Sequence, residues 1–143
     1  FFLAVPLWSA MDLNIDYEQL PMMIPAPAQG VVAICGRADD EEIKEIFKDI
    51  NHIKTQICIE IERNFLNTLE GGCTAPIGAF AEMNDQNEVR FQARLCSLDG
   101  KNSIETDEIF QWNETENFGK ILADKVLNNG GRELMLEIKN QLK

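Results

Sequence analysis

The sequence predicts an α+β fold in which a small three-stranded antiparallel sheet is covered on one face by helices. Apolar residues recur at helical spacing over residues 53–69 and again over 115–142. Between these stretches the pattern changes to an alternation of apolar and polar residues, over 77–83 and over 89–95. Helical periodicity on both sides of alternating segments favours helices packed against an antiparallel sheet.

The N-terminal part is expected to be less regular. Residues 1–13 read as the end of a helix, and a polar, proline-rich connector follows over 14–28. The β-branched run 31–34 predicts a short buried strand. Asp39 is expected to cap a helix, because Glu42 follows three residues later and both suit the positive end of the helix dipole. The apolar stripe of this helix is Ile43, Ile46, Phe47 and Ile50.

The remaining elements follow in order. A helix over 53–69 carries one apolar stripe, made of Ile57, Cys58, Ile61, Phe65 and Leu69. A turn at 85–87 separates the first two strands, and a turn at 99–100 precedes a third, less regular strand over 103–112. The next helix, over 115–128, is expected to bury Phe118, Ile121 and Leu122. Two glycines at 130–131 end it, and the last helix places Leu134, Ile138 and Leu142 on one face.

Charge and composition exclude several classes of function. The chain has 143 residues, 45% of them apolar, and a net charge of −11 at pH 7. Its first basic residue is Arg37, whereas nucleic acids and anionic membranes attract lysine and arginine. No run approaches the roughly 20 apolar residues of a membrane span. We therefore expect a cytoplasmic protein that binds neither nucleic acid nor membrane.

The apolar start of the chain, residues 1–8, lacks the basic region of a secretory signal and contains Pro6. We interpret it as an internal segment of a longer protein. Removed from its packing neighbours, such a patch is expected to self-associate, which predicts a dimer or a larger species.

Cys35, Cys58, Cys73 and Cys96 are widely spaced, and the chain has a single histidine, His52. A zinc site usually needs closely paired ligands, so no metal site is expected. Four cysteines allow two disulfides, but free thiols are favoured because the sequence shows no secretory signal.

Cys73 is the candidate reactive residue. It follows Gly71 and Gly72 at the end of a helical pattern and precedes Pro76 and a strand. Consecutive glycines permit positive φ at a helix end and let a large partner approach the backbone. A buried structural role is the usual alternative for a free cysteine, whereas this placement favours a reactive thiol at a loop tip.

Several blocks of the sequence resemble the porphobilinogen deaminase family, whose members are also called hydroxymethylbilane synthases. The most specific block is Leu-Glu-Gly-Gly-Cys-Thr-Ala-Pro-Ile-Gly at 69–78. The other blocks occur in the same order and at matching separations, at 25–30, 38–40, 51–52, 62–66, 97–100 and 128–133. The resemblance covers essentially the whole chain.

This resemblance implies that Cys73 carries a dipyrromethane cofactor through a thioether, with Gly71 and Gly72 leaving room beside it. It also implies that Gln29 and Gly30 face the cofactor. Members of this family are transferases of tetrapyrrole (haem) biosynthesis. In them the cofactor primes the stepwise addition of four porphobilinogen units. A thiolate that attacks an electrophilic azafulvene carbon suits such an anchor, because sulfur is a soft nucleophile and the thioether resists hydrolysis.

The resemblance further implies a division of the chain. Residues 1–51 match the family's preceding domains and hinge, and residues 52–143 match the cofactor-binding C-terminal domain. The family's catalytic aspartate and most of its substrate-binding arginines lie in parts that precede this sequence, so no catalytic residue is expected here and the fragment alone should be inactive. Its expected partners are porphobilinogen, polypyrrole intermediates and the missing N-terminal domains.

One departure from the family pattern is Ala28, which stands where glycine is usual and puts the local turn around Gln29 in doubt. Two alternative functions remain: a non-catalytic stand-alone or remnant module, and an unrelated thiol enzyme. The second is poorly supported, because His52 is the one histidine available as a base. We expect His52 to be a hydrogen-bonding residue at a helix boundary.

Glu62 and Arg63 are interpreted as a structural ion pair that holds their helix to a neighbouring element, with no catalytic role. Cys35, Cys58 and Cys96 are likewise interpreted as structural.

Overall fold

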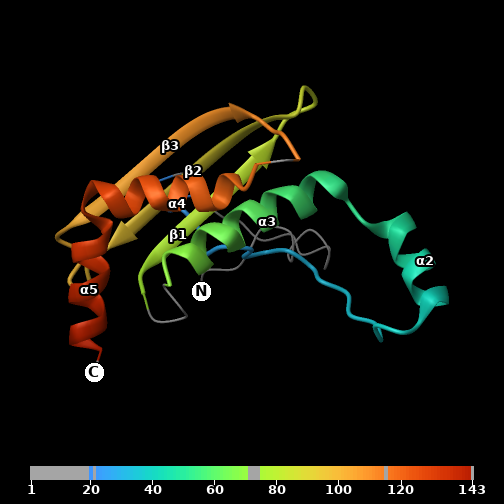
Figure 1. The fold of residues 1–143 in the computed structure, drawn as a ribbon, viewed down its shortest axis with the longest axis horizontal. Coiled ribbons are helices and arrows are strands. Elements are labelled where there is room, and N and C mark those ends of the chain that lie inside the picture. The colour runs from blue at the N-terminus through green and yellow to red at the C-terminus, as the bar shows by residue number, and fades with distance from the viewer. Residues whose placement is uncertain (1–19, 21, 71–74, 115, 143) are drawn as a thin grey trace.

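The computed structural model describes residues 20, 22–70, 75–114 and 116–142 (Figure 1). The elements are, in order, α2 (Glu41–Ile50), α3 (Ile53–Thr68), β1 (Ile77–Met83), β2 (Glu88–Cys96), β3 (Ser103–Gln111), α4 (Phe118–Val126), the π-helical turn η1 (Leu127–Gly131) and α5 (Arg132–Gln141). The helix expected at 1–13 and the apolar patch 1–8 lie outside the described residues.

The predicted α+β fold is confirmed. The sheet has three antiparallel strands in the order β1-β2-β3, and Phe91 at its centre lies opposite Ala81 and Glu108. Helices α3 and α4 lie together across one face of the sheet (Figure 1). The alternation seen in the sequence places every second residue of β1 and β2 in the core, namely Ile77, Ala79, Ala81, Val89, Phe91, Ala93 and Leu95.

The core forms where α3 meets the sheet. The predicted stripe of α3 is confirmed, since Cys58, Ile61, Phe65 and Leu69 are all buried. The ring of Phe65 packs edge-on against Phe91, with ring centroids 5.0 Å apart and an interplanar angle of 60°. This contact fixes the C-terminal half of α3 on the sheet.

Helix α4 crosses α3 at very close range. Its buried residues are Gly119, Leu122, Ala123 and Val126, a spacing that forms one face of a helix. Ile121 projects from the other side and is 43% exposed, so the expectation that it is buried is wrong. Leu142 is also exposed, because α5 ends at Gln141 and buries Leu134 and Ile138 before that point.

The predictions for the segment before α3 are wrong in two respects. Residues 31–34 form no strand and Val32 is 83% exposed, because no described strand pairs with them. Asp40 rather than Asp39 caps α2, with its Oδ1 accepting from the Ile43 N–H at 3.1 Å. Helix α2 buries none of its residues, and its apolar stripe borders the groove described below.

Within the described ranges, no helix is both long enough and apolar enough to cross a lipid bilayer.

Candidate functional site

The connection between α3 and β1 contains Gly71, Gly72 and Cys73, which lie outside the described residues, so their predicted roles stay predictions. The residues before them are well anchored. Leu69 is 2% exposed, and Glu70 adopts a left-handed conformation with φ +53°. The Lys139 ammonium of α5 donates to Glu70 Oε2 at 2.7 Å, which lowers the pKa of this exposed carboxyl. Helix α5 is thus linked to the end of α3 by an exposed ion pair.

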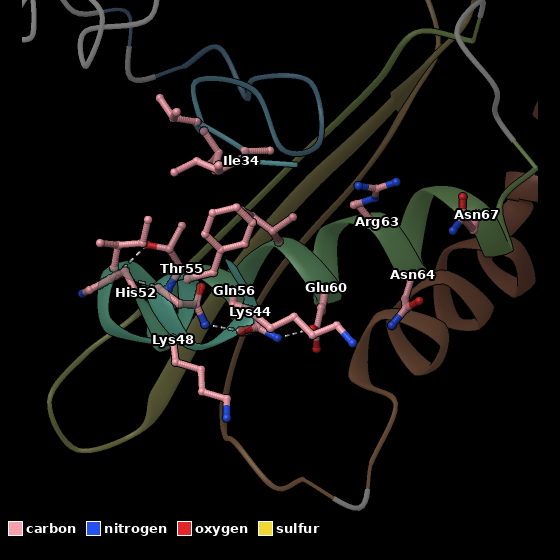
Figure 2. A pocket seen from close by; sticks show the side chains of 17 residues that line it. Ile34, Lys44, Lys48, His52, Thr55, Gln56, Glu60, Arg63, Asn64 and Asn67 are labelled. Carbon is pink, nitrogen blue, oxygen red and sulfur yellow. Dashed lines mark hydrogen bonds between the residues drawn. The ribbon is translucent and has the colours of Figure 1, made fainter. Parts of the chain in front are cut away.

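A groove of about 780 Å³ runs along α3 toward this connection (Figure 2). Its walls are residues 31–34, helix α2 and the outward face of α3. The lining mixes apolar side chains with nitrogen donors and one carboxylate, Glu60, which accepts from the Gln56 amide at 2.9 Å. The donors are Lys44, Lys48, Asn51, His52, Gln56, Arg63, Asn64 and Asn67. Groove size and lining are suitable for an organic ligand that carries negative charge.

Gln29 and Gly30 lie on an exposed turn that begins at Pro25. The Gln29 N–H donates to the Ala26 carbonyl at 3.0 Å, and the Gln29 side-chain Oε1 accepts from the Ala26 N–H at 3.1 Å. Ala28 has φ +61° and Gly30 has φ +86°. The turn therefore forms despite alanine at a position where glycine is favoured.

Glu62 holds this turn in place. The side chain is buried, with 5% exposed. Its Oε2 accepts from the Ala28 N–H at 2.6 Å, and its Oε1 accepts from the Ala81 N–H of β1 at 2.8 Å. The expected ion pair with Arg63 is wrong, because Glu62 accepts from backbone amides whereas Arg63 is exposed and lines the groove.

Sequence reasoning missed this role of Glu62, although a signal was present. Glu62 follows Cys58 by four residues and precedes Phe65 by three, which places it on the buried stripe of α3. A carboxylate on a buried stripe requires hydrogen-bond donors around it.

The segment around Pro25 runs along the outer edge of β1. The Ala79 N–H donates to the Pro25 carbonyl at 2.9 Å. Gly78 permits this approach, because a Cβ there would lie 2.7 Å from the Ile24 carbonyl oxygen. Pro25 and Glu62 together satisfy two amides of β1, which is an edge strand with no further strand beside it among the described residues.

Burial raises the pKa of Glu62 above its ordinary value of 4.5, and the amides of Ala28 and Ala81 partly oppose this shift. A raised pKa means that the folded state binds the proton more tightly than the unfolded state. The contribution of Glu62 to stability is therefore greatest below pH 4.5 and is lost as the pH rises through the raised pKa.

We expect the free energy of unfolding of the wild type to decrease relative to that of Glu62→Gln as the pH rises from 4 to 8. The slope of this decrease should be at most about 1.4 kcal/mol per pH unit. Urea unfolding at a series of pH values measures this decrease.

Glu60→Gln is the control, because it removes the same charge from the exposed side of α3. Cys58, a buried residue of α3 that interacts electrostatically with Glu62, stays neutral in this range because burial raises its pKa to about 11. A difference independent of pH would contradict the prediction.

The other candidate residues have structural positions. His52 is the N-cap of α3, and its ring Nδ1 accepts from the Thr55 N–H at 3.4 Å, which confirms its expected place at a helix boundary. Cys35 is exposed, Cys58 is buried and Cys96 is half-buried, and all three are free thiols. Among the residues that the structure describes, no cluster of three or more His, Cys, Asp or Glu side chains could hold a metal ion.

The chain is similar in sequence to known proteins over most of its length. The family model described as "Porphobilinogen deaminase, C-terminal domain" matches residues 56–128, which include most of α3, the sheet and α4. The porphobilinogen deaminase of Carboxydothermus hydrogenoformans is 38% identical over 128 residues, covering 90% of this chain and 41% of that protein.

Two further relatives extend the comparison. The porphobilinogen deaminase of Chloroherpeton thalassium is 37% identical over 82% of this chain and 38% of its own length. The probable porphobilinogen deaminase of Methanosarcina acetivorans is 36% identical over 89% of this chain and 41% of its own length. The chain spans about two fifths of the length of these relatives. With the family model matched across the helices and sheet described above, the chain belongs to the porphobilinogen deaminase family and contains its C-terminal domain.

Proposed function

We propose that this chain is the cofactor-carrying part of a hydroxymethylbilane synthase, a transferase that joins four porphobilinogen molecules. The observation that carries the proposal is the family match over 56–128, because this range contains Cys73 within the Glu-Gly-Gly-Cys block. Cys73 would hold a dipyrromethane primer through a thioether, and Gly71 and Gly72 would leave space beside the sulfur.

The described residues fit such a group. The pyrroles of this pathway carry acetate and propionate side chains, which need hydrogen-bond donors and cations. The groove along α3 offers Arg63, Asn64 and Asn67 on the turns that lead to residue 70. Gln29 and Gly30, on the turn held by Glu62, are proposed to face the same group. Once bound, the primer supplies the pyrrole terminus that is extended.

This chain's own residues anchor and orient the primer. We propose that residues 52–143 form the cofactor-binding domain, and that residues 1–51 belong to the preceding domains and hinge. Turnover would require the rest of the enzyme, with porphobilinogen and the polypyrrole intermediates as its ligands. A cytoplasmic location, self-association through residues 1–8 and inactivity of the fragment alone are parts of the same proposal.

The intact mass of the chain tests the proposal. Produced together with the N-terminal part of the enzyme, the wild type should gain the mass of two linked pyrroles and give a positive colour reaction for pyrroles. Cys73→Ser should gain nothing, because a hydroxyl is far less nucleophilic than a thiolate. Cys35→Ser is the control, since Cys35 is an exposed free thiol. A wild-type chain without adduct under these conditions would refute the proposal.

A non-catalytic module that keeps the fold without turnover is the second candidate. Porphobilinogen consumption separates the two. Turnover by the chain combined with the N-terminal part supports the synthase, whereas an adduct without turnover supports the module.

A further inference from the structure

Glu62 connects three segments that are distant in the sequence. Its two carboxylate oxygens accept from amides 34 residues before it and 19 residues after it, at Ala28 and Ala81. Among the described residues, the buried polar or charged side chains are Glu62 and Ser97. A buried carboxylate is unfavourable unless hydrogen-bond donors surround it. The Glu62 side chain therefore depends on the two hydrogen bonds that it accepts.

We propose that Glu62 is a positioning residue that fixes the Gln29-Gly30 turn against α3 and β1, and so determines where Gln29 presents its side chain. This inference rests on the proposed function for its link to the primer, because that proposal assigns Gln29 and Gly30 to the cofactor.

The turn needs outside support because of Ala28. Its φ of +61° lies in the left-handed region, which a Cβ disfavours and glycine adopts freely. The Glu62 carboxylate accepts the N–H of this same residue, at the shortest of the turn's hydrogen bonds, 2.6 Å. Glu62 therefore acts on the residue at which the turn is strained.

The turn in its formed state also orients Gln29. The side-chain Oε1 is engaged by the Ala26 N–H within the turn. An amide has one acceptor oxygen and one NH₂ donor group. Because the oxygen is engaged by Ala26, the NH₂ group of this exposed side chain is the part of Gln29 that can contact a ligand, and as a donor it suits a carboxylate rather than a cation.

A carboxyl group suits this position, because each of its two oxygens can accept a hydrogen bond from one of the two amides. Glutamine has the same shape but a single oxygen, so its NH₂ group would face one of the two N–H donors. The Ala81 amide belongs to a strand that β2 also holds. We therefore expect the turn, the less constrained partner, to detach in Glu62→Gln.

Residue-resolved hydrogen exchange on the 143-residue chain tests the proposal. The Gln29 amide, which donates to Ala26, reports on the formed turn. In Glu62→Gln its exchange should accelerate by at least about tenfold, while the Phe91 amide in the central strand changes by less than about twofold. Glu60→Gln, on the exposed side of α3, should leave both unchanged.

Ala28→Gly provides a rescue that a merely structural role would not show. In the Glu62→Gln background, glycine relieves the opposition to positive φ, so Gln29 protection should return to within about threefold of the wild type. If Glu62→Gln does not fold, Ala28→Gly alone serves the same purpose, because it should slow Gln29 exchange relative to the wild type.

The proposal is overturned if the Gln29 amide is unprotected in the wild type, or if Glu62→Gln leaves it unchanged. Equal acceleration at Gln29 and Phe91 would also overturn it, since that pattern reports general destabilisation. The exchange measurement needs no adduct on Cys73. A chain without adduct whose Gln29 responds as expected refutes the proposed function and leaves the positioning role of Glu62 intact.

Discussion

Phe65→Ala is expected to lower the free energy of unfolding by about 3–5 kcal/mol, the largest effect of a single substitution that we predict. Phe65 is 1% exposed and packs edge-on against Phe91, so its removal leaves a cavity between α3 and the sheet. Small domains are stable by only about 5–15 kcal/mol. Equilibrium urea unfolding, with an unchanged dependence on denaturant, measures the loss.

Phe80→Ala is the matched control. Phe80 lies on β1 between the buried residues Ala79 and Ala81, so its ring points to the opposite face of the sheet and is 42% exposed. Its replacement should cost less than about 1 kcal/mol. Equal losses for the two phenylalanines would show that the face covered by α3 is not the core.

Gly119→Ala is expected to destabilise the domain by about 2–3 kcal/mol although alanine favours helices. A Cβ at this position would lie 2.3 Å from the Ile61 carbonyl oxygen, 2.7 Å from Asn64 Cβ and 2.9 Å from the Phe65 nitrogen. Backbone atoms of α3 cannot rotate away as a flexible side chain can. The two helices must therefore separate, which disturbs the core beneath them, and thermal unfolding should show a clear decrease in Tm.

Gly100→Ala separates this steric effect from the general cost of replacing glycine. Gly100 has φ +71°, and a Cβ there would have no heavy atom within 4 Å. Its replacement should cost about 1 kcal/mol through backbone strain alone. A loss at Gly119 no larger than the loss at Gly100 would contradict the close approach of α4 to α3.

The sequence predicted the elements that carry their own periodicity. Helix α3 and strands β1 and β2 have patterns of apolar residues that match their buried faces, so their limits agree within about one residue of the prediction. Residues 31–34 have strand-like side chains too, but a strand also needs a partner to accept its backbone hydrogen bonds. That requirement is set by the tertiary structure and is not visible in a local pattern.

Only part of the candidate site could be predicted, because some of its contacts join residues that are distant in the sequence. The turn at Gln29 was expected from a resemblance, whereas its support by Glu62 depends on a contact across 34 residues. Ile121 shows a related limit, because the face that α4 buries was set by Gly119, a residue with no side chain to contribute to an apolar pattern.

The hydrogen bonds on the outer side of β1 have a consequence for any shortened version of this protein. The Pro25 carbonyl and the Glu62 carboxylate occupy the amides of Ala79 and Ala81. A polypeptide that starts after residue 30 would lack the Pro25 carbonyl and would expose the Ala79 N–H on the outer edge of β1. An exposed strand edge pairs with strands of other molecules and promotes fibrous aggregates. The proline-rich connector thus protects the edge of β1 from aggregation, and expression of the isolated domain should include it.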